Sequence, residues 1–181
     1  ETVAAFEKEI GLDRPAATRY VEWVTGVAQG DFGSSYSGVG GLRQIERKVS
    51  DMIGPRLYNT LFLAVMTAII AVPLALFLGI TAALYRNSLY DRAVNAVTLT
   101  TIALPEFFVA YVLMFFFAIK VRWFYSLSTV SVDTSFIEHI KRAFLPSLTL
   151  TLVIVAHIMR MTRASIINLL SSPYIEMAQL K

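Results

Sequence analysis

The sequence predicts an all-α polytopic membrane protein, and its composition and charge pattern are the basis for this fold class. Of the 181 residues, 56% are hydrophobic and 16% are charged, and the mean hydropathy is +0.60. Soluble domains carry about 25% charged residues. Three runs, 57–85, 93–119 and 143–159, hold 29, 27 and 17 residues with Glu106 as their single charge. Because about 17–25 apolar residues cross a bilayer as a helix, each run is long enough for a span, the third marginally.

This composition excludes several classes of function. A soluble enzyme is excluded by the long apolar runs, and no nucleic acid is expected as a partner, because the net charge of +3 comes from basic residues beside apolar spans. The absence of cysteine removes disulfides and thiolate chemistry. No Gly-x-x-x-x-Gly-Lys-Ser/Thr run offers an ATP site. His139 and His157 lack a second ligand at metal spacing, so we expect no metal, no other cofactor and no catalytic residue.

Residues 1–56 are polar and are predicted to form amphipathic helices outside the membrane. Four apolar residues share one helical face at spacings of three and four, and five more do so further on. The first set is Tyr20, Trp23, Val24 and Val27, and the second is Leu42, Ile45, Val49, Met52 and Ile53. The glycines and serines of 30–41 predict a loop between them. The second helix belongs either to a small extramembrane layer or to the membrane interface.

We predict the first span at 57–84, about 42 Å long as a straight helix, so that tilt, a kink or protruding ends are expected. Gly79 would allow a neighbouring helix to approach closely. A tight polar turn at 86–92 leads to the next span.

The second span is predicted at 93–119 and is interrupted by Pro105. A polar loop at 120–142 precedes the third span, 143–165, in which Pro146 would occupy the first helical turn. His157, near the end of this span, is expected to pack against neighbours or form an interhelical hydrogen bond, with a role in a transport pathway as the alternative.

Glu106 is the one ionisable residue well inside a span. A carboxylate at mid-span costs about 2.5–3.5 kcal/mol, so such a residue warrants a functional hypothesis. It would contribute to a translocation path or to a subunit contact. The alternative is structural: next to Pro105, its carboxylate could cap amides that the helix break leaves free.

The C-terminal residues predict a helix break followed by a new helix. Ser171, Ser172 and Pro173 would end the preceding helix, and 174–181 would begin another. The chain opens with Glu1 and stops inside this helix, so we expect it to be an internal piece of a longer protein.

Several segments together resemble the membrane subunits of ABC importers for di- and oligopeptides. In order they are GDFGSSY at 30–36, RLYNTL at 56–61, YRNSLYDR at 85–92, IALPEFF at 102–108, LPSLTL at 145–150, RMTRAS at 160–165 and YIEMAQLK at 174–181. The last is similar to the family's cytoplasmic EAA motif, which docks on the ATPase. Met177 replaces the usual small central residue of that motif, and the motif's glycine, separated from Ala178 by three residues, would be residue 182.

The resemblance implies a type I ABC importer permease fold with three of about six spans present. It implies an extracytoplasmic segment at 1–56, a transmembrane permease domain at 57–181, and a cytoplasmic coupling helix at 174–181. Counting lysines and arginines does not establish this orientation, since the implied cytoplasmic side carries fewer of them. The implied location is the plasma (inner) membrane of a bacterium or archaeon.

The resemblance also implies partners and site residues. The partners would be a second permease subunit, usually a different chain, two ABC ATPase subunits that hydrolyse ATP, an extracytoplasmic substrate-binding protein and the lipid bilayer. The coupling residues would be Tyr174, Glu176, Met177, Ala178 and Lys181. Three alternatives remain open: an importer of nickel complexes or oligosaccharides, a membrane scaffold or sensor that transports nothing, and an intramembrane enzyme, for which no nucleophile is found.

Overall fold

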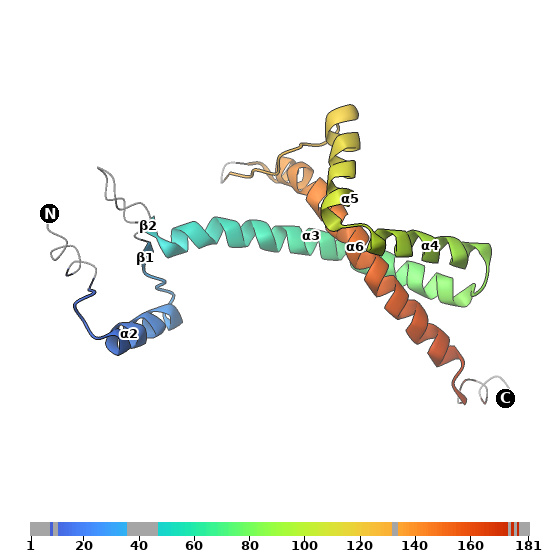
Figure 1. The fold of residues 1–181 in the computed structure, drawn as a ribbon, viewed down its shortest axis with the longest axis horizontal. Helices are drawn as coiled ribbons and strands as arrows, with labels where there is room; N and C mark the ends of the chain where they lie inside the picture. The colour runs from blue at the N-terminus through green and yellow to red at the C-terminus, as the bar shows by residue number, and fades with distance from the viewer. Residues whose placement is uncertain are drawn as a thin grey trace. The chain divides into compact units, whose positions relative to one another are not determined.

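The structure is a computed structural model that describes residues 8, 11–35, 47–131, 134–173, 175 and 177. The chain divides into two units, Glu1–Tyr58 and Asn59–Lys181, which are described separately. Figure 1 shows the elements in chain order, from α2 to α6.

The first unit contains helix α2 and a short pair of strands. Helix α2 (Ala16–Ala28) confirms the first predicted amphipathic helix, and its residues Tyr20 and Trp23 have their rings 6.5 Å apart. Strands β1 (Ser34–Ser35) and β2 (Arg47–Lys48) pair antiparallel, with Ser34 opposite Lys48. Residues 34–35, predicted as loop, are therefore extended.

The second predicted amphipathic helix is partly wrong. Arg47 and Lys48 lie in β2, and Val49, Met52 and Ile53 belong to the start of a much longer helix, α3 (Val49–Leu84). Leu42 and Ile45 lie outside the described residues. The spacing of three and four residues between apolar side chains over 42–53 fits a helix, but residues 47–48 pair with Ser34 and Ser35 as a strand.

Helix α3 buries a stripe of small side chains in the second unit. Thr67, Ala71, Ala75, Gly79 and Ala83 recur every four residues and are buried. This spacing places them on one face of the helix, where small residues let another backbone approach closely. A Cβ atom at Gly79 would lie 2.7 Å from Thr162 Cβ and 2.9 Å from the Met159 carbonyl oxygen. The close approach predicted at Gly79 is confirmed, and its partner is helix α6 (Phe136–Leu170).

The polar turn after α3 is shorter than predicted. Helix α4 (Leu89–Ala103) begins at Leu89, because the Ser88 hydroxyl accepts a hydrogen bond from the Asp91 amide and caps the helix. Asn87 adopts a positive φ of 65°, a conformation that asparagine tolerates better than most residues. The remainder of the predicted turn is helical.

The second predicted span is bent sharply at the proline. Helix α4 ends at Ala103, and helix α5 (Glu106–Leu113) begins directly after Pro105 and continues as the π-helical segment η1 (Met114–Lys120). The bend between the two parts is 105°, and Figure 1 shows α5 turning away from α4. The break falls where Pro105 predicted an interruption, although composition alone did not indicate so large a bend.

The loop before α6 is also shorter than predicted. Residues 136–142, expected to be loop, are helical, because Ser135 and Glu138 form the Ser-x-x-Glu pattern of a helix start and the Glu138 amide donates to the Ser135 hydroxyl at 3.4 Å. Pro146 is consequently inside the helix instead of in its first turn.

The apolar core of the second unit lies where α3 and α6 meet. Ala71, Ala75 and Ala82 pack with Val155 and Met159, and Leu78, Val94, Ile154 and Ile158 surround them. Among the described residues, α3 and α6 are each long and apolar enough to cross a membrane, and α4 with α5–η1 would form a third crossing if the bent pair is one span.

Candidate functional site

The predicted coupling segment follows the end of α6. The helix ends at Leu170, Ser171 and Ser172 are not helical, and Pro173, Ile175 and Met177 are in helical conformation. The predicted break is therefore confirmed. Met177 is 71% exposed. Tyr174, Glu176, Ala178 and Lys181 lie outside the described residues, so their coupling role stays a prediction.

Glu106, the predicted path residue, is the first residue of α5 and has an exposed side chain. A carboxylate in this position is favoured by the positive end of the helix dipole. Within the described part of the chain its carboxylate accepts no hydrogen bond, which disfavours the amide-capping alternative.

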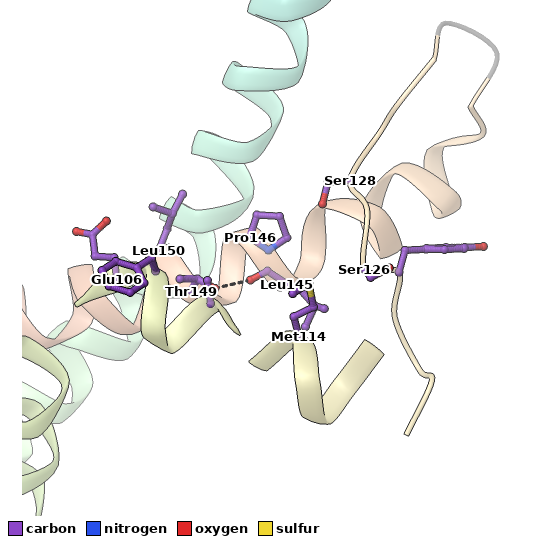
Figure 2. Close-up of a pocket in the computed structure, with 11 residues that line it drawn as sticks. Glu106, Met114, Ser126, Ser128, Leu145, Pro146, Thr149 and Leu150 are labelled. Atoms are coloured by element: carbon purple, nitrogen blue, oxygen red, sulfur yellow. Dashed lines mark hydrogen bonds between the residues drawn. The ribbon is translucent and has the colours of Figure 1, made fainter. Parts of the chain in front are cut away.

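Glu106 lies at one end of a pocket of about 410 Å³ between α5–η1, the following loop and α6. Phe107, Ala110 and Met114 come from α5–η1, whereas Leu145, Pro146 and Thr149 come from α6. Figure 2 shows the Glu106 carboxylate directed away from Met114 and Leu145, and the Thr149 hydroxyl bonded to the Leu145 carbonyl, 2.9 Å away. The lining is mostly apolar, with the carboxylate at its rim.

The loop that closes this pocket is bonded to α6 at the proline. Pro146 has no amide proton, so the Arg142 carbonyl one turn earlier lacks its usual helical donor. The Ser128 hydroxyl donates to that carbonyl at 2.8 Å. Ser126 and Ser128 both line the pocket, so the bond helps to position its wall.

The Arg142 side chain holds the same loop. Its guanidinium donates to the Thr129 carbonyl and lies 4.9 Å from the centre of the Tyr125 ring. It also pairs with Glu138 one turn earlier on α6, at 2.6 Å. The loop from Tyr125 to Thr129 therefore has three contacts with residue 142, two through its side chain and one through its carbonyl.

A second charged cluster joins α4 to α6. Arg163 Nε and Nη2 donate to the two oxygens of Asp91, each at 2.7 Å. This bidentate pair links residues 72 positions apart, and the Asp91 side chain is 4% exposed. Such charge-assisted bonds are short and fix the relative orientation of the two groups.

The remaining donors around Asp91 come from its own helix and the turn before it. Asn95 Nδ2 donates to Asp91 Oδ1 at 2.7 Å, and the Asn87 amide donates to Oδ2 at 3.0 Å. Each carboxylate oxygen thus accepts two hydrogen bonds. A buried carboxylate without such partners would be strongly unfavourable, so this cluster stabilises the buried charge.

Sequence reasoning did not find this pair, although a signal was present. Asp91 precedes a charge-poor run by two residues, and Arg163 follows another by four. Charges at such positions in a helical bundle tend to pair with one another. The polar residue one turn after Asp91, Asn95, lies on the same helical face and was a further indication.

The two histidines lie in different surroundings. His139 is buried and stacks on Phe62, with ring centres 4.0 Å apart. His157 has an exposed side chain, so the packing predicted for it is not found within the described chain. No group of three or more His, Asp or Glu residues in the described ranges is arranged to hold a metal ion.

Comparison of the sequence with known proteins identifies the family of this chain. A family model described as "Binding-protein-dependent transport system inner membrane component" matches residues 71–181. That match covers more than half of the chain. The chain therefore belongs to this family of transport permease components.

Individual relatives are similar over the whole chain. The "Probable peptide ABC transporter permease protein y4tP" of Sinorhizobium fredii is 31% identical over all of this chain and 56% of its own length. The glutathione transport system permease protein GsiC of Salmonella choleraesuis is 34% identical over all of this chain and 54% of its own. The chain thus spans about half the length of the curated relatives it matches.

Proposed function

We propose that this chain is part of a permease subunit of an ATP-driven importer, and that the subunit forms a translocation path for di- and oligopeptides. The observation that carries the proposal is similarity along the entire chain to relatives named for peptide and glutathione transport. These names favour peptides over nickel complexes or oligosaccharides. Membership of a transport family disfavours a scaffold, a sensor or an intramembrane enzyme.

The proposed partners follow from the mechanism of such an importer. ATP is hydrolysed by two separate ATPase subunits, a second permease subunit completes the path, and a binding protein delivers the peptide from outside a bacterial or archaeal inner membrane. The chain itself is not an enzyme. The segment 174–181 docks on an ATPase as a short amphipathic helix, a recognised mode of helix-in-groove binding. The helix break at Ser171 and Ser172 supports this assignment, because it separates the docking helix from α6.

The pocket beside Glu106 is proposed as part of the path or of the contact with the second permease subunit. Its apolar wall suits peptide side chains, and an exposed carboxylate without a partner in the described chain suits a cationic group. A peptide's amino terminus or a basic residue of the second subunit would provide that cation.

Co-purification of the complete subunit from its native host tests the proposed assembly. We expect two ATPases and a second permease in gentle detergent, and we expect deletion of 174–181 to release the ATPases while the second permease stays bound. Such a release would also assign the C-terminal end of α6 to the cytoplasmic side. Purification of the subunit alone, under conditions that keep a control importer intact, would contradict the proposal and favour the scaffold.

Substitution of Glu106 tests its role in the path. Glu106→Gln keeps the shape of the side chain and removes the charge, so we expect the KM for peptide uptake by the complete transporter to rise. As a control, Glu22→Gln removes an exposed carboxylate of the first unit that pairs with Arg14 and does not line the pocket. If the Glu106→Gln transporter took up peptide and assembled as the unaltered transporter does, Glu106 would have no role in the path or in the subunit contact.

A further inference from the structure

One turn of α6 contacts both other long helices of the second unit. The Met159 carbonyl and the Thr162 side chain lie against Gly79 of α3. Arg163, the next residue, holds Asp91 at the start of α4. The three helices therefore meet within the five residues 159–163.

The two contacts differ in how they resist motion. The contact at Gly79 is a close van der Waals approach between helices, which lacks directional bonds and permits small sliding movements. The contact at Asp91 is a planar guanidinium fork on a carboxylate, whose distance and angle are both fixed. Asn95 and the Asn87 amide occupy the remaining positions on that carboxylate, so its orientation is set from three sides.

The pair also lies between the coupling segment and the rest of the bundle. Arg163 is seven residues before the end of α6 at Leu170, which is about 10 Å along a helix. Asp91 is in the first turn of α4, next to the turn that connects α4 to α3. A displacement that enters at the end of α6 therefore reaches this pair before it reaches the core around Met159.

We infer that Asp91 and Arg163 are positioning residues that make the α3–α4 turn move together with the C-terminal part of α6. Movement of the coupling segment by an ATPase would then be transmitted to α3 and α4 as well as to α6. This inference rests on the proposed function. Neither residue contacts the pocket beside Glu106, so the pair acts on transport through the helices it connects.

Variants of the complete importer in proteoliposomes test the inference through the ratio of peptide imported to ATP hydrolysed. Arg163→Met leaves the Asp91 charge buried without its partner and is expected to impair assembly. The double variant Asp91→Asn with Arg163→Met removes both charges, so assembly should recover. We expect its import per ATP to remain about fivefold or more below that of the unaltered complex, the lower end of typical coupling between sites.

Two further variants distinguish a positioning role of Arg163 in transport from a role in assembly alone. Arg163→Lys keeps the cation but not the fork, and we expect normal assembly with import per ATP between the double variant and the unaltered complex. Arg160→Met is the matched control, because Arg160 is exposed, lies on the same helix and forms no ion pair in the described chain. It should leave the ratio unchanged. If the double variant imported as much peptide per ATP hydrolysed as the Arg160→Met control, the inference would be wrong.

A distance measurement tests the same inference without reference to any substrate. Spin labels at Leu89→Cys and Leu169→Cys report on α4 and α6, and both leucines are exposed in a chain without cysteine. Between the nucleotide-free and vanadate-trapped states, their separation should change by no more than the about 1–2 Å of a small helix shift. In the double variant it should change by more. A large change in the unaltered complex would refute joint motion, whereas failure of peptide import alone would refute the proposed substrate.

Discussion

Helix α6 carries an ion-paired arginine near each end, and the two pairs differ in their partners and in their burial. Arg142 pairs with Glu138 on the same helix, and the two side chains are 27% and 38% exposed. Arg163 pairs with Asp91 on another helix, and the carboxylate there is 4% exposed. Arg142 holds the loop from Tyr125 to Thr129 against α6, whereas Arg163 joins α6 to α4.

The difference in burial determines how easily each contact can be remade. Water can solvate Arg142 and Glu138 when they separate, so loss of this ion pair costs little. Separation of Arg163 from Asp91 would leave a buried carboxylate without its cation, which is far more costly. The two ends of α6 therefore combine an adaptable loop contact with a fixed helix contact, as expected if the loop end admits substrate and the other end transmits force.

The largest expected effect is on stability at the Asp91 end. Arg163→Met should lower the free energy of unfolding by about 3–5 kcal/mol, because an uncompensated carboxylate stays buried. Arg142→Met should cost about 1–2 kcal/mol, from a half-exposed ion pair and a contact with the Tyr125 ring. Thermal unfolding of the purified complex, monitored by circular dichroism, compares the two. Equal losses would show that burial does not distinguish the two arginines.

A smaller effect is expected where α3 crosses α6. A Cβ atom at Gly79 would lie 2.7 Å from Thr162 Cβ, and neither this branched side chain nor the Met159 backbone can move aside easily. Gly79→Ala should therefore cost about 1–3 kcal/mol in stability by the same unfolding measurement.

Gly54 supplies the matched control for this substitution. It lies in the same helix, and no atom of the described residues beyond its own helical turn lies within 4 Å of the position where its Cβ would be. Gly54→Ala should stabilise the helix by up to about 1 kcal/mol through helix propensity alone. If the two alanine variants behaved alike, the close approach of α6 at Gly79 would not limit the size of the residue there.

The sequence allowed much of this fold to be predicted, because apolar runs and small residues have direct physical meaning in a membrane. The all-α class followed from runs such as 57–85, and the close approach at Gly79 followed from its missing side chain. The helix starts at Leu89 and Phe136 were missed, since Ser88 and Ser135 act through local capping bonds that hydropathy does not register. No local pattern indicated the size of the 105° bend beside Pro105, whose two arms, α4 and α5, both contact α6.

The candidate site was less predictable than the fold. Glu106 stood out because a charge within an apolar run is unusual, and the structure places it at a pocket. Asp91 and Arg163 lie just outside such runs, where charges are common, and are 72 residues apart. Pairing at that separation is a property of tertiary packing. The role of 174–181 was predicted by resemblance alone and remains a prediction.

The smallest expected effect concerns the loop contact at the Arg142 end. Ser128→Ala removes the donor to the Arg142 carbonyl and should cost about 0.5–1.5 kcal/mol in the free energy of unfolding. The reason is specific, because Pro146 cannot supply the amide that would otherwise satisfy that carbonyl. Pro146→Ala would restore an amide donor there, so the hydroxyl should become dispensable.

A double-mutant cycle isolates this compensation. Ser128→Ala should cost less in the Pro146→Ala background than in the unaltered protein, and the difference between the two costs measures the coupling of serine to proline. Ser126→Ala is the control, since Ser126 lines the same pocket and forms no hydrogen bond in the described chain. Equal costs of Ser128→Ala in both backgrounds would mean that the hydrogen bond of this serine does not compensate for the missing amide of Pro146. The contrast between the two ends of α6 would then rest on the exposure of the Arg142 ion pair and the burial of Asp91, and not on the proline.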